Sequence, residues 1–418
     1  METHGRRKRA AARDLPDRLS NLPDRLLLAF LSQLRPRQVV QTSALSRRWR
    51  HLWRAVPCIH IDSDDFPSQI KEDSEPESSE QEDTDLDDDW DPEADEFAKE
   101  IRLFEAEEDA LAKLEDFADN LLFHRSLSGD VLDTLRFRIH RRDGRPRSSN
   151  DTDMITRWIR RGLRLSPAAL DIIGDGDPVE LPCYFFNPGA GRLTKLRLEN
   201  VRLRRPVQDI LCTDTLPALE DLEIRNTVLV PVISWITSDT LTNLTIVYES
   251  SGRGRQNDSP RSRRIGRSEV CITAPRLASL RLEFPLAGLA NYNFTLMETP
   301  CLAQASICLL GETHLLWHWL DVDDQPDTAS WLIKDLRRLL GSLCNVTSLH
   351  LSGFQQMVHT GGALPQAVLD EPRCVFPNLT SLVLGDCDLG GGLQTLWRFL
   401  HNTPALDRLA LTSCKVLV

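Results

Sequence analysis

The chain has 418 residues, of which 41% are hydrophobic and 27% are charged, and its formal net charge is −12. This length predicts more than one folded unit. No apolar run approaches the roughly 18 residues that would cross a membrane, and no apolar segment follows the basic start, so we expect neither a membrane span nor a secretory signal.

Residues 1–14 form a basic tail, which we expect to be disordered. Its cluster Arg6–Arg9 is typical of a nuclear import signal, and also of a tail that is simply solvated. The ten cysteines of the chain form no Cys-x-x-Cys pair, a pattern typical of free thiols in a reducing compartment. We therefore expect the protein in the nucleus and/or the cytoplasm.

Three short helices are predicted between residues 15 and 56. Asn21 is a candidate cap for the first, in which apolar residues recur at helical spacing from Leu26 to Leu34. Arg35-Pro36 ends this helix, because proline disfavours the α conformation of the preceding residue. Two further helices follow, one with paired valines and one with two tryptophans. So small a segment cannot bury all of this apolar surface in its own core, so it either covers the next domain or binds a partner.

The residues of this segment resemble an F-box. The resemblance rests on Leu22-Pro23 before the first helix, on Val39-Val40 in the second, and on the run Leu-Ser-Arg-Arg-Trp from Leu45 to Trp49. It implies docking on a Skp-type adaptor, and through that adaptor on the cullin scaffold of a ubiquitin ligase. The implied adaptor-binding residues are Leu22, Pro23, Leu26, Leu27, Phe30, Leu31, Val39, Val40, Leu45, Trp49, Leu52 and Trp53.

Residues 57–98 are strongly acidic. From Asp62 to Ala98 there are 18 Asp and Glu residues and a single basic residue, Lys71. Such a segment repels itself and has little apolar surface to bury, so we predict a disordered linker. An amphipathic helix is then predicted over residues 95–124.

Residues 99–418 contain a repeated pattern. The stretch 379–389, Leu-Thr-Ser-Leu-Val-Leu-Gly-Asp-Cys-Asp-Leu, matches the leucine-rich repeat at each fixed position, and 406–416 matches with Val416 last. A proline precedes the first leucine by two residues in several copies, where it favours an extended strand. Looser copies begin at Leu132, Leu193, Leu219, Leu241, Leu277, Leu302 and Val346, with a faint one near Pro167.

Repeats of this kind stack, because no single copy can bury its own leucines. The pattern predicts an α/β fold: a three-helix F-box followed by an irregular leucine-rich-repeat solenoid with a curved parallel sheet. Helices are predicted to return the chain at about 152–163, 329–343 and 392–402. Residues 251–267 hold six arginines and are predicted to be a flexible basic insertion, which is either solvated or paired with the acidic tract. The insertion has no aromatic residues for base stacking, which argues against nucleic acid as a partner.

No catalytic motif is found, and we expect neither an enzyme activity nor a cofactor. Phosphate-binding loops, dinucleotide glycine patterns and nucleophile elbows are absent from the sequence. His314 and His318 have the spacing of a metal pair on a helix, but no His-Glu-x-x-His accompanies them, and we assign no metal site. Cys387 and Cys414 occupy the repeat position of a small buried residue and are predicted core residues.

The arrangement from residue 15 onward is similar to plant F-box/leucine-rich-repeat proteins. This family often continues into a C-terminal FBD segment, which the sequence up to Val418 is expected to lack. The resemblance implies a substrate receptor of a Skp–cullin–F-box ubiquitin ligase with an unknown target protein and no membrane. One alternative is a scaffold protein built of repeats that binds partners without ubiquitin transfer. The other is a hydrolase or metal enzyme, and the absence of catalytic motifs argues against it.

The target is predicted to bind the concave face of the solenoid. Side chains alternate along a strand, so the residues between the inward leucines lie on the opposite face. Acidic residues such as Glu199, Asp221, Glu223 and Glu283 share this face with the predicted binding residues. These predicted target-binding residues are Lys195, Arg197, Arg225, Arg281, His350 and Arg408.

Overall fold

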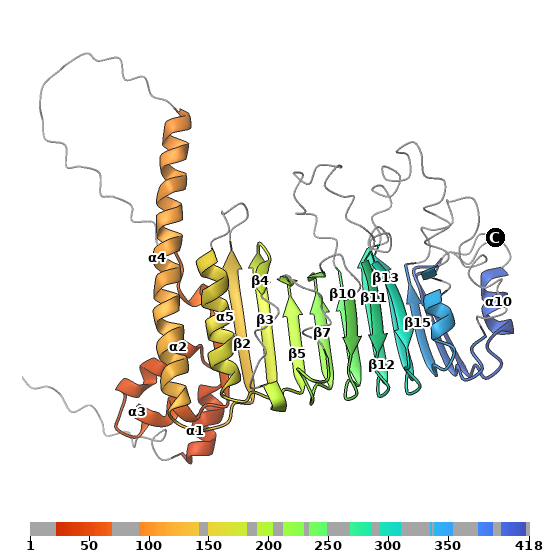
Figure 1. Ribbon diagram of the computed structural model, residues 1–418, viewed down its shortest axis with the longest axis horizontal. Coiled ribbons are helices and arrows are strands. Elements are labelled where there is room, and N and C mark those ends of the chain that lie inside the picture. The colour runs from red at the N-terminus through yellow and green to blue at the C-terminus, as the bar shows by residue number, and fades with distance from the viewer. Residues whose placement is uncertain are drawn as a thin grey trace, which may run out of the picture.

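A small helical module at the N-terminal end leads into a long arc of parallel strands (Figure 1). This is the α/β architecture that the repeats predict. The computed structural model describes residues 22–68, 92–141, 149–181, 190–203, 212–229, 234–248, 268–285, 292–310, 335–336, 338–353, 375–387 and 394–414. The basic tail 1–14, most of the acidic tract and the Arg-rich insertion 251–267 lie outside these residues.

The N-terminal module contains α1 (Asp24–Leu31), α2 (Pro36–Gln41) and α3 (Trp49–Leu52). Pro36 opens α2, where its fixed φ fits the first helical turn and its missing N–H costs nothing. The predicted cap of the first helix is wrong. The helix begins at Asp24, and Pro23 occupies the cap position without a side-chain hydrogen bond. Asn21 itself lies outside the described residues.

The main sheet has 11 strands, all paired in parallel with their neighbours. Each of the predicted repeat copies forms one of its strands, so the predicted solenoid is confirmed. The strands are β1 (Cys58–Asp62), β2 (Thr134–Arg141), β3 (Ala169–Gly176), β5 (Lys195–Glu199), β7 (Asp221–Arg225), β10 (Asn243–Val247), β12 (Ser279–Pro285), β14 (Gln304–Leu310), β15 (Ser348–Ser352), β16 (Ser381–Gly385) and β17 (Arg408–Thr412).

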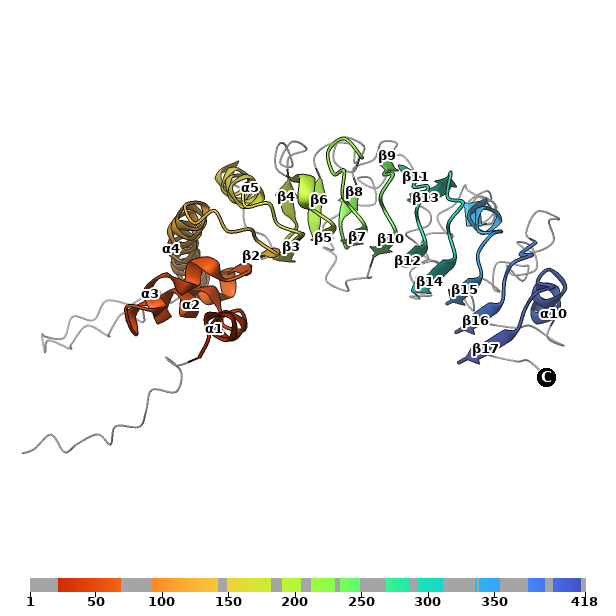
Figure 2. The same cartoon turned by 90° about the horizontal axis from the view of Figure 1, so that it is seen from below.

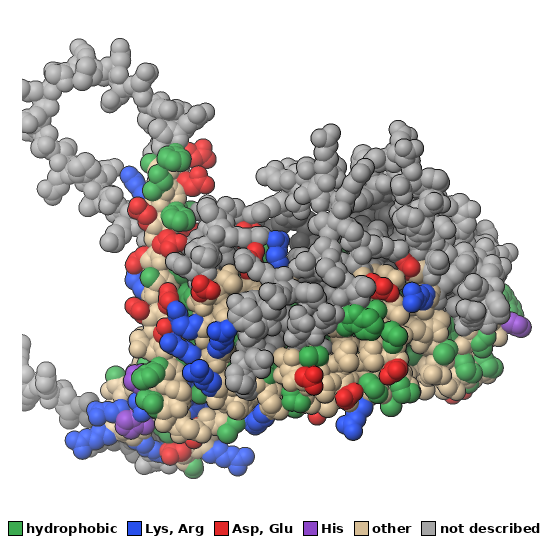
Figure 3. Space-filling model, in the orientation of Figure 1, with side chains coloured by type: hydrophobic (Ala, Val, Ile, Leu, Met, Phe, Trp, Pro, Cys, Tyr) green, Lys and Arg blue, Asp and Glu red, His purple; other side chains and the backbone are tan. Residues whose placement is uncertain are grey.

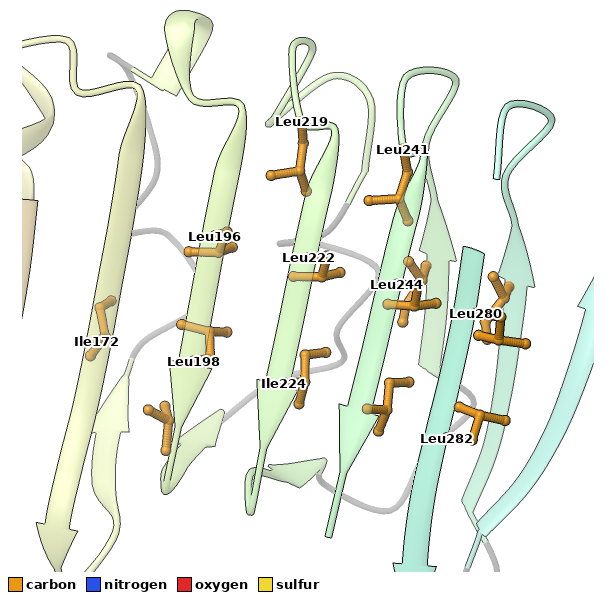
Figure 4. Packing of buried hydrophobic residues seen from close by; sticks show 14 of the residues in the cluster. Ile172, Leu196, Leu198, Leu219, Leu222, Ile224, Leu241, Leu244, Leu280 and Leu282 are labelled. Atoms are coloured by element: carbon orange, nitrogen blue, oxygen red, sulfur yellow. The ribbon is translucent and has the colours of Figure 1, made fainter. Parts of the chain in front are cut away.

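The core is a ladder of aliphatic residues behind this sheet. Leu196, Leu222 and Leu244 are register partners on successive strands, and all three are buried (Figure 4). A second row of buried residues lies two positions further along the strands, where Leu198 is the register partner of Ile224. Each fully buried side chain of this size contributes about 1.5–3 kcal/mol, so the stacked copies stabilise one another.

The outer side of the arc carries shorter elements (Figure 2). Helices return the chain where predicted in α5 (Ser149–Leu163) and α10 (Gln394–His401), and residues 338–342 of the third predicted helix are helical. Between several other strands of the main sheet the described return segments form strands instead, which were not predicted. They form two small sheets, β4 (Val179–Leu181), β6 (Val201–Leu203) and β8 (Val228–Leu229), and β9 (Ser234–Thr237), β11 (Ser268–Thr273) and β13 (Tyr292–Met297).

The predicted linker 57–98 differs from the structure at both ends. Residues 58–62 form β1, the first strand of the sheet, and the helix predicted from residue 95 begins at Pro92. This helix, α4 (Pro92–Ser126), lies across the N-terminal end of the solenoid beside α5 (Figure 1). The Trp158 indole of α5 donates a hydrogen bond to Asp119 of α4 at 3.0 Å, and Arg161 pairs with the same carboxylate at 2.7 Å.

Candidate functional surfaces

The helical module has its own small core. Leu27, Leu31, Val39, Trp49 and Leu52 are buried together with Val56 in one cluster, separate from the core of the solenoid. Arg48 closes the module by donating to the Asp24 carboxylate (Nε to Oδ1, 3.1 Å), which ties α1 to the segment that leads into α3. The three helices are thus held by their own apolar faces.

The structure divides the predicted adaptor-binding residues into three groups. Five of these residues belong to the core of the module and lie beneath its surface: Leu27, Leu31, Val39, Trp49 and Leu52. Trp53 and Val40 are half-buried and pack against the solenoid core, so they belong to the junction between the two parts. The members of the set that face outward are Pro23, Leu26, Phe30 and Leu45, with Leu22 half-buried beside them.

Arginines surround this outward apolar group. Residues 22–56 contain seven arginines and a single acidic residue, Asp24. Arg25, Arg47 and Arg50 are exposed, and the space-filling view shows basic side chains gathered over the module (Figure 3). The module therefore presents large apolar side chains within a positively charged surface, which complements an acidic partner.

Several contacts attach the module to the solenoid. Arg35 pairs with Asp65 at 3.0 Å, and Arg37 lies over the Phe66 ring, 5.4 Å from its centroid. Burial raises the pKa of Asp65, and the hydrogen bond from Arg35 partly offsets this effect. On the other side, Arg125 of α4 is buried and donates to the Val56 carbonyl at 3.0 Å.

The predicted target-binding residues all lie on the face of the main sheet opposite its buried leucines, on the inner side of the arc (Figure 2). They share this face because side chains alternate between the two faces along each strand. Their role in target binding stays a prediction. The central row of this concave face, from β1 to β17, reads His60, Arg136, Asp171, Arg197, Glu223, Thr245, Arg281, Ser306, His350, Val383 and Ala410.

The charges on the N-terminal half of this face are paired within the chain. Lys195 bonds Asp221 at 2.7 Å, Arg197 bonds Glu199 at 2.6 Å, Arg281 bonds Glu283 at 2.5 Å, and Arg225 pairs with Glu223. The sequence did not predict this pairing. Lys195–Asp221 depends on the register between two strands, whereas the other three pairs join residues two positions apart on one strand. The face therefore carries alternating charge rather than a basic patch.

A shallow groove of about 440 Å³ crosses the strands of this charged half. Arg136 and Asp171 line it, bonded at 2.7 Å, and neither was among the predicted target-binding residues, although both occupy the same repeat position as Arg197. Burial tends to raise the pKa of Asp221 in the same groove, but hydrogen bonds from Lys195 and Asn243 outweigh it and lower the pKa. On β1, burial and the charge of Arg136 lower the pKa of His60.

The C-terminal half of the concave face is different, with small and mostly uncharged residues. Ser306 and His350 are hydrogen-bonded to each other at 3.1 Å (Oγ to Nδ1). The central row then continues with Val383 and Ala410. The face thus changes between β12 and β14 from an alternating charged surface to a mostly uncharged one, with Arg408 on β17 as a charged exception.

Metal-ligating side chains do not gather in the part of the chain that the structure describes. Its residues contain no group of three or more His, Cys, Asp or Glu side chains arranged to hold a metal ion. His314 and His318 lie outside it. Cys387 is buried and Cys414 packs against the same core, as predicted. None of the described helices is both long and apolar enough to cross a membrane.

Comparison with known proteins matches residues 19–60 to the F-box domain. Over 426 aligned residues the chain is 32% identical to the meiotic F-box protein MOF of Oryza sativa subsp. japonica, covering 96% of this chain and 72% of that protein. It is 25% identical to an F-box/FBD/LRR-repeat protein of Arabidopsis thaliana over 407 residues, covering 94% and 78%. Another such Arabidopsis protein is 55% identical over 53 residues, 13% of this chain and 12% of that protein. The chain belongs to the family of plant F-box proteins.

Proposed function

We propose that this protein is a substrate receptor of a Skp–cullin–F-box ubiquitin ligase. The observation that carries the proposal is the F-box surface, where Leu26, Phe30 and Leu45 are exposed within a ring of arginines. Large apolar residues left exposed on a small domain mark a binding site, and the arginines favour an acidic adaptor. The adaptor would in turn attach the protein to a cullin scaffold.

The repeats supply the second binding surface, the concave face of the solenoid. F-box proteins are in general receptors without catalytic activity, and the chemistry belongs to the partner enzymes. The receptor acts by proximity, because holding a target lysine near a charged ubiquitin carrier raises its effective concentration. We further propose that the protein acts in the nucleus and/or the cytoplasm; the Arg6–Arg9 cluster is a candidate import signal, with a solvated basic tail as the alternative.

Charged target residues gain little from the N-terminal half of the concave face. Its arginines already have carboxylate partners, and a target would have to break those pairs to form new ones. The neutral half around Ser306 and His350 has no such competition. The proposed target segment is therefore uncharged where it contacts β14 to β16, and Arg408 adds a positive charge on β17.

Adaptor binding by the full chain tests the proposal. Phe30→Ala with Leu45→Ala should weaken binding to a purified Skp-type adaptor by about 2 kcal/mol or more, or about 30-fold, since apolar anchors dominate such interfaces. Phe123→Ala with Leu127→Ala is the matched control, because these residues are similarly exposed on and just after α4. It should bind like the wild type.

Two results would contradict the proposal. Equal adaptor affinity of both double variants, with circular dichroism showing that both are folded, would mean that the exposed F-box residues do not form the interface. A wild-type chain that binds no adaptor would instead favour the scaffold function, in which the repeats bind partners without ubiquitin transfer.

A further inference from the structure

The basic residues of this chain are mainly arginines. The sequence has 50 Lys and Arg residues, and seven of them are lysines: Lys8, Lys71, Lys99, Lys113, Lys195, Lys334 and Lys415. Lysine is normally among the commonest residues of a globular protein, so this number is low. The chain therefore carries most of its positive charge on guanidinium groups rather than on amines.

The same bias is found on the concave face of the main sheet. Its described strand residues include one lysine, Lys195, and six arginines: Arg136, Arg138, Arg197, Arg225, Arg281 and Arg408. Two of these arginines have a structural reason. Arg136 and Arg197 each donate two hydrogen bonds to one carboxylate, a planar fork that lysine does not reproduce. This geometry does not account for the scarcity of lysine over the whole chain.

The difference between the two residue types matters for ubiquitin transfer. The attacking group is a neutral lysine amine, whose Nζ forms an isopeptide bond with the terminal carboxyl carbon of ubiquitin. The thioester bond between ubiquitin and its carrier breaks, the carrier's thiolate leaves, and the amine loses a proton to water. A guanidinium stays protonated at physiological pH and is no nucleophile. Arginine thus provides positive charge near the carrier without providing an acceptor.

The lysine of the concave face is held in its protonated form. Lys195 lies opposite Asp221 in the register of β5 and β7, and its ammonium bonds this carboxylate at 2.7 Å. The hydrogen bond and the charge of Asp221 raise the pKa of Lys195, which lowers the fraction of reactive amine. The Lys195 side chain is 65% exposed, so the solvated pair reduces its reactivity by only about two- to fivefold.

We propose that the scarcity of lysine directs ubiquitin to the bound target and protects the receptor from modifying itself. This inference rests on the proposed function and adds what decides which lysines receive ubiquitin. Proximity alone does not distinguish target from receptor, because side chains of both are held near the carrier. Lys195 is the acceptor that remains on the described concave face, and Asp221 restrains it.

Amine reactivity tests the pairing of Lys195 without any partner protein. The full chain is treated briefly with acetic anhydride at mildly alkaline pH, and acetylation of each lysine is followed by mass spectrometry. Asp221→Asn should speed acetylation of Lys195 about two- to fivefold and leave that of Lys99, exposed on α4, unchanged. Asp171→Asn is the matched control, because it removes a carboxylate of the same groove that bonds Arg136 instead. Equal rates at Lys195 in both variants would overturn the role of Asp221.

Ubiquitin transfer tests the scarcity of lysine. The full chain is assembled with a Skp-type adaptor, a cullin scaffold and a charged carrier, and ubiquitin on the receptor is located by mass spectrometry. Arg276→Lys with Arg408→Lys adds two exposed amines and keeps the charge. It should raise the ubiquitin on the receptor about twofold or more, at the two new positions. Arg276→Gln with Arg408→Gln is the control and should raise modification at no lysine.

A flexible lysine-bearing tag fused to the C-terminus reports whether the assembled ligase is active. If the tag receives ubiquitin only when the adaptor is present, the proposed function stands. Native lysines that are then modified as readily as the introduced ones would overturn the present inference alone. Introduced lysines that stay unmodified beside a modified tag would overturn it as well. A tag that receives no ubiquitin would count against the proposed function, and this inference would fall with it.

Discussion

Single residues at the strand ends adopt a backbone conformation that sets which side chains the repeats can tolerate. Asn200, Asn226, Asp386 and Gly353 each follow a strand of the main sheet and have φ between 46° and 83°. Each donates its N–H to a strand-end carbonyl of the next repeat, as Asn200 does to Arg225 at 2.8 Å. Asn, Asp and Gly accept this left-handed conformation more readily than other residues. The sequence contained this signal, but one repeat alone would not have disclosed it.

Gly353 gives the sharpest prediction at this scale. A Cβ atom there would lie 1.7 Å from the Leu309 carbonyl oxygen, and its φ is +83°. Gly353→Ala should therefore lower the free energy of unfolding by about 2 kcal/mol or more, measured by urea denaturation. Gly341→Ala is the control, in a helical turn with open space around the new methyl group, and should be neutral or stabilising by about 0.5–1 kcal/mol. Equal effects of both substitutions would contradict the prediction.

At the scale of elements, the repeat strands could be predicted from the sequence and the pieces between them could not. The spacing of leucines located each strand of the main sheet after β1, because burial of a repeated apolar pattern leaves few alternatives. From the sequence, β1 falls in the predicted acidic linker, because its copy of the pattern has Val56, Ile59 and Ile61 where the repeat has leucines and runs directly into the acidic tract. The outer strands depend on how neighbouring repeats stack, which no single repeat encodes.

If β1 is an integral strand of the sheet, its inward residues should matter for stability. Ile61 is buried in the same core as the repeat leucines, so Ile61→Ala should cost about 2–5 kcal/mol of unfolding free energy in urea denaturation. Ile101→Ala removes the same atoms from an exposed position on α4 and should change stability by less than about 0.5 kcal/mol. A small effect at Ile61 would place β1 outside the cooperative core.

The whole molecule joins the F-box to the solenoid through side chains rather than through a free linker. Arg35–Asp65, Arg37–Phe66 and Arg125–Val56 bridge the two parts from different directions. The sequence separates these partners by about thirty residues or more, so the contacts could not be predicted from spacing. These contacts hold the proposed adaptor-binding surface at a fixed distance from the proposed target-binding surface.

Arg125 tests this coupling most directly, because it is 1% exposed and donates to the carbonyl of Val56, itself part of the F-box core. Burial lowers the pKa of Arg125, while the nearby Asp130 carboxylate, 3.6 Å away, favours its charge. In Arg125→Met the buried carbonyl loses its donor, which should cost about 1–3 kcal/mol.

The loss should be local to the junction. In native-state hydrogen exchange with increasing urea, wild-type amides of α1 to α3 should open with the same free energy as those of β1 and β2, because the parts unfold together. Arg125→Met should lower the opening free energy of the F-box amides and leave β10 to β14 unchanged. Arg102→Met, at an exposed position of α4, is the control and should change neither. An F-box that already opens separately in the wild type, or an equal loss at β10 to β14, would show that Arg125 does not couple the two parts.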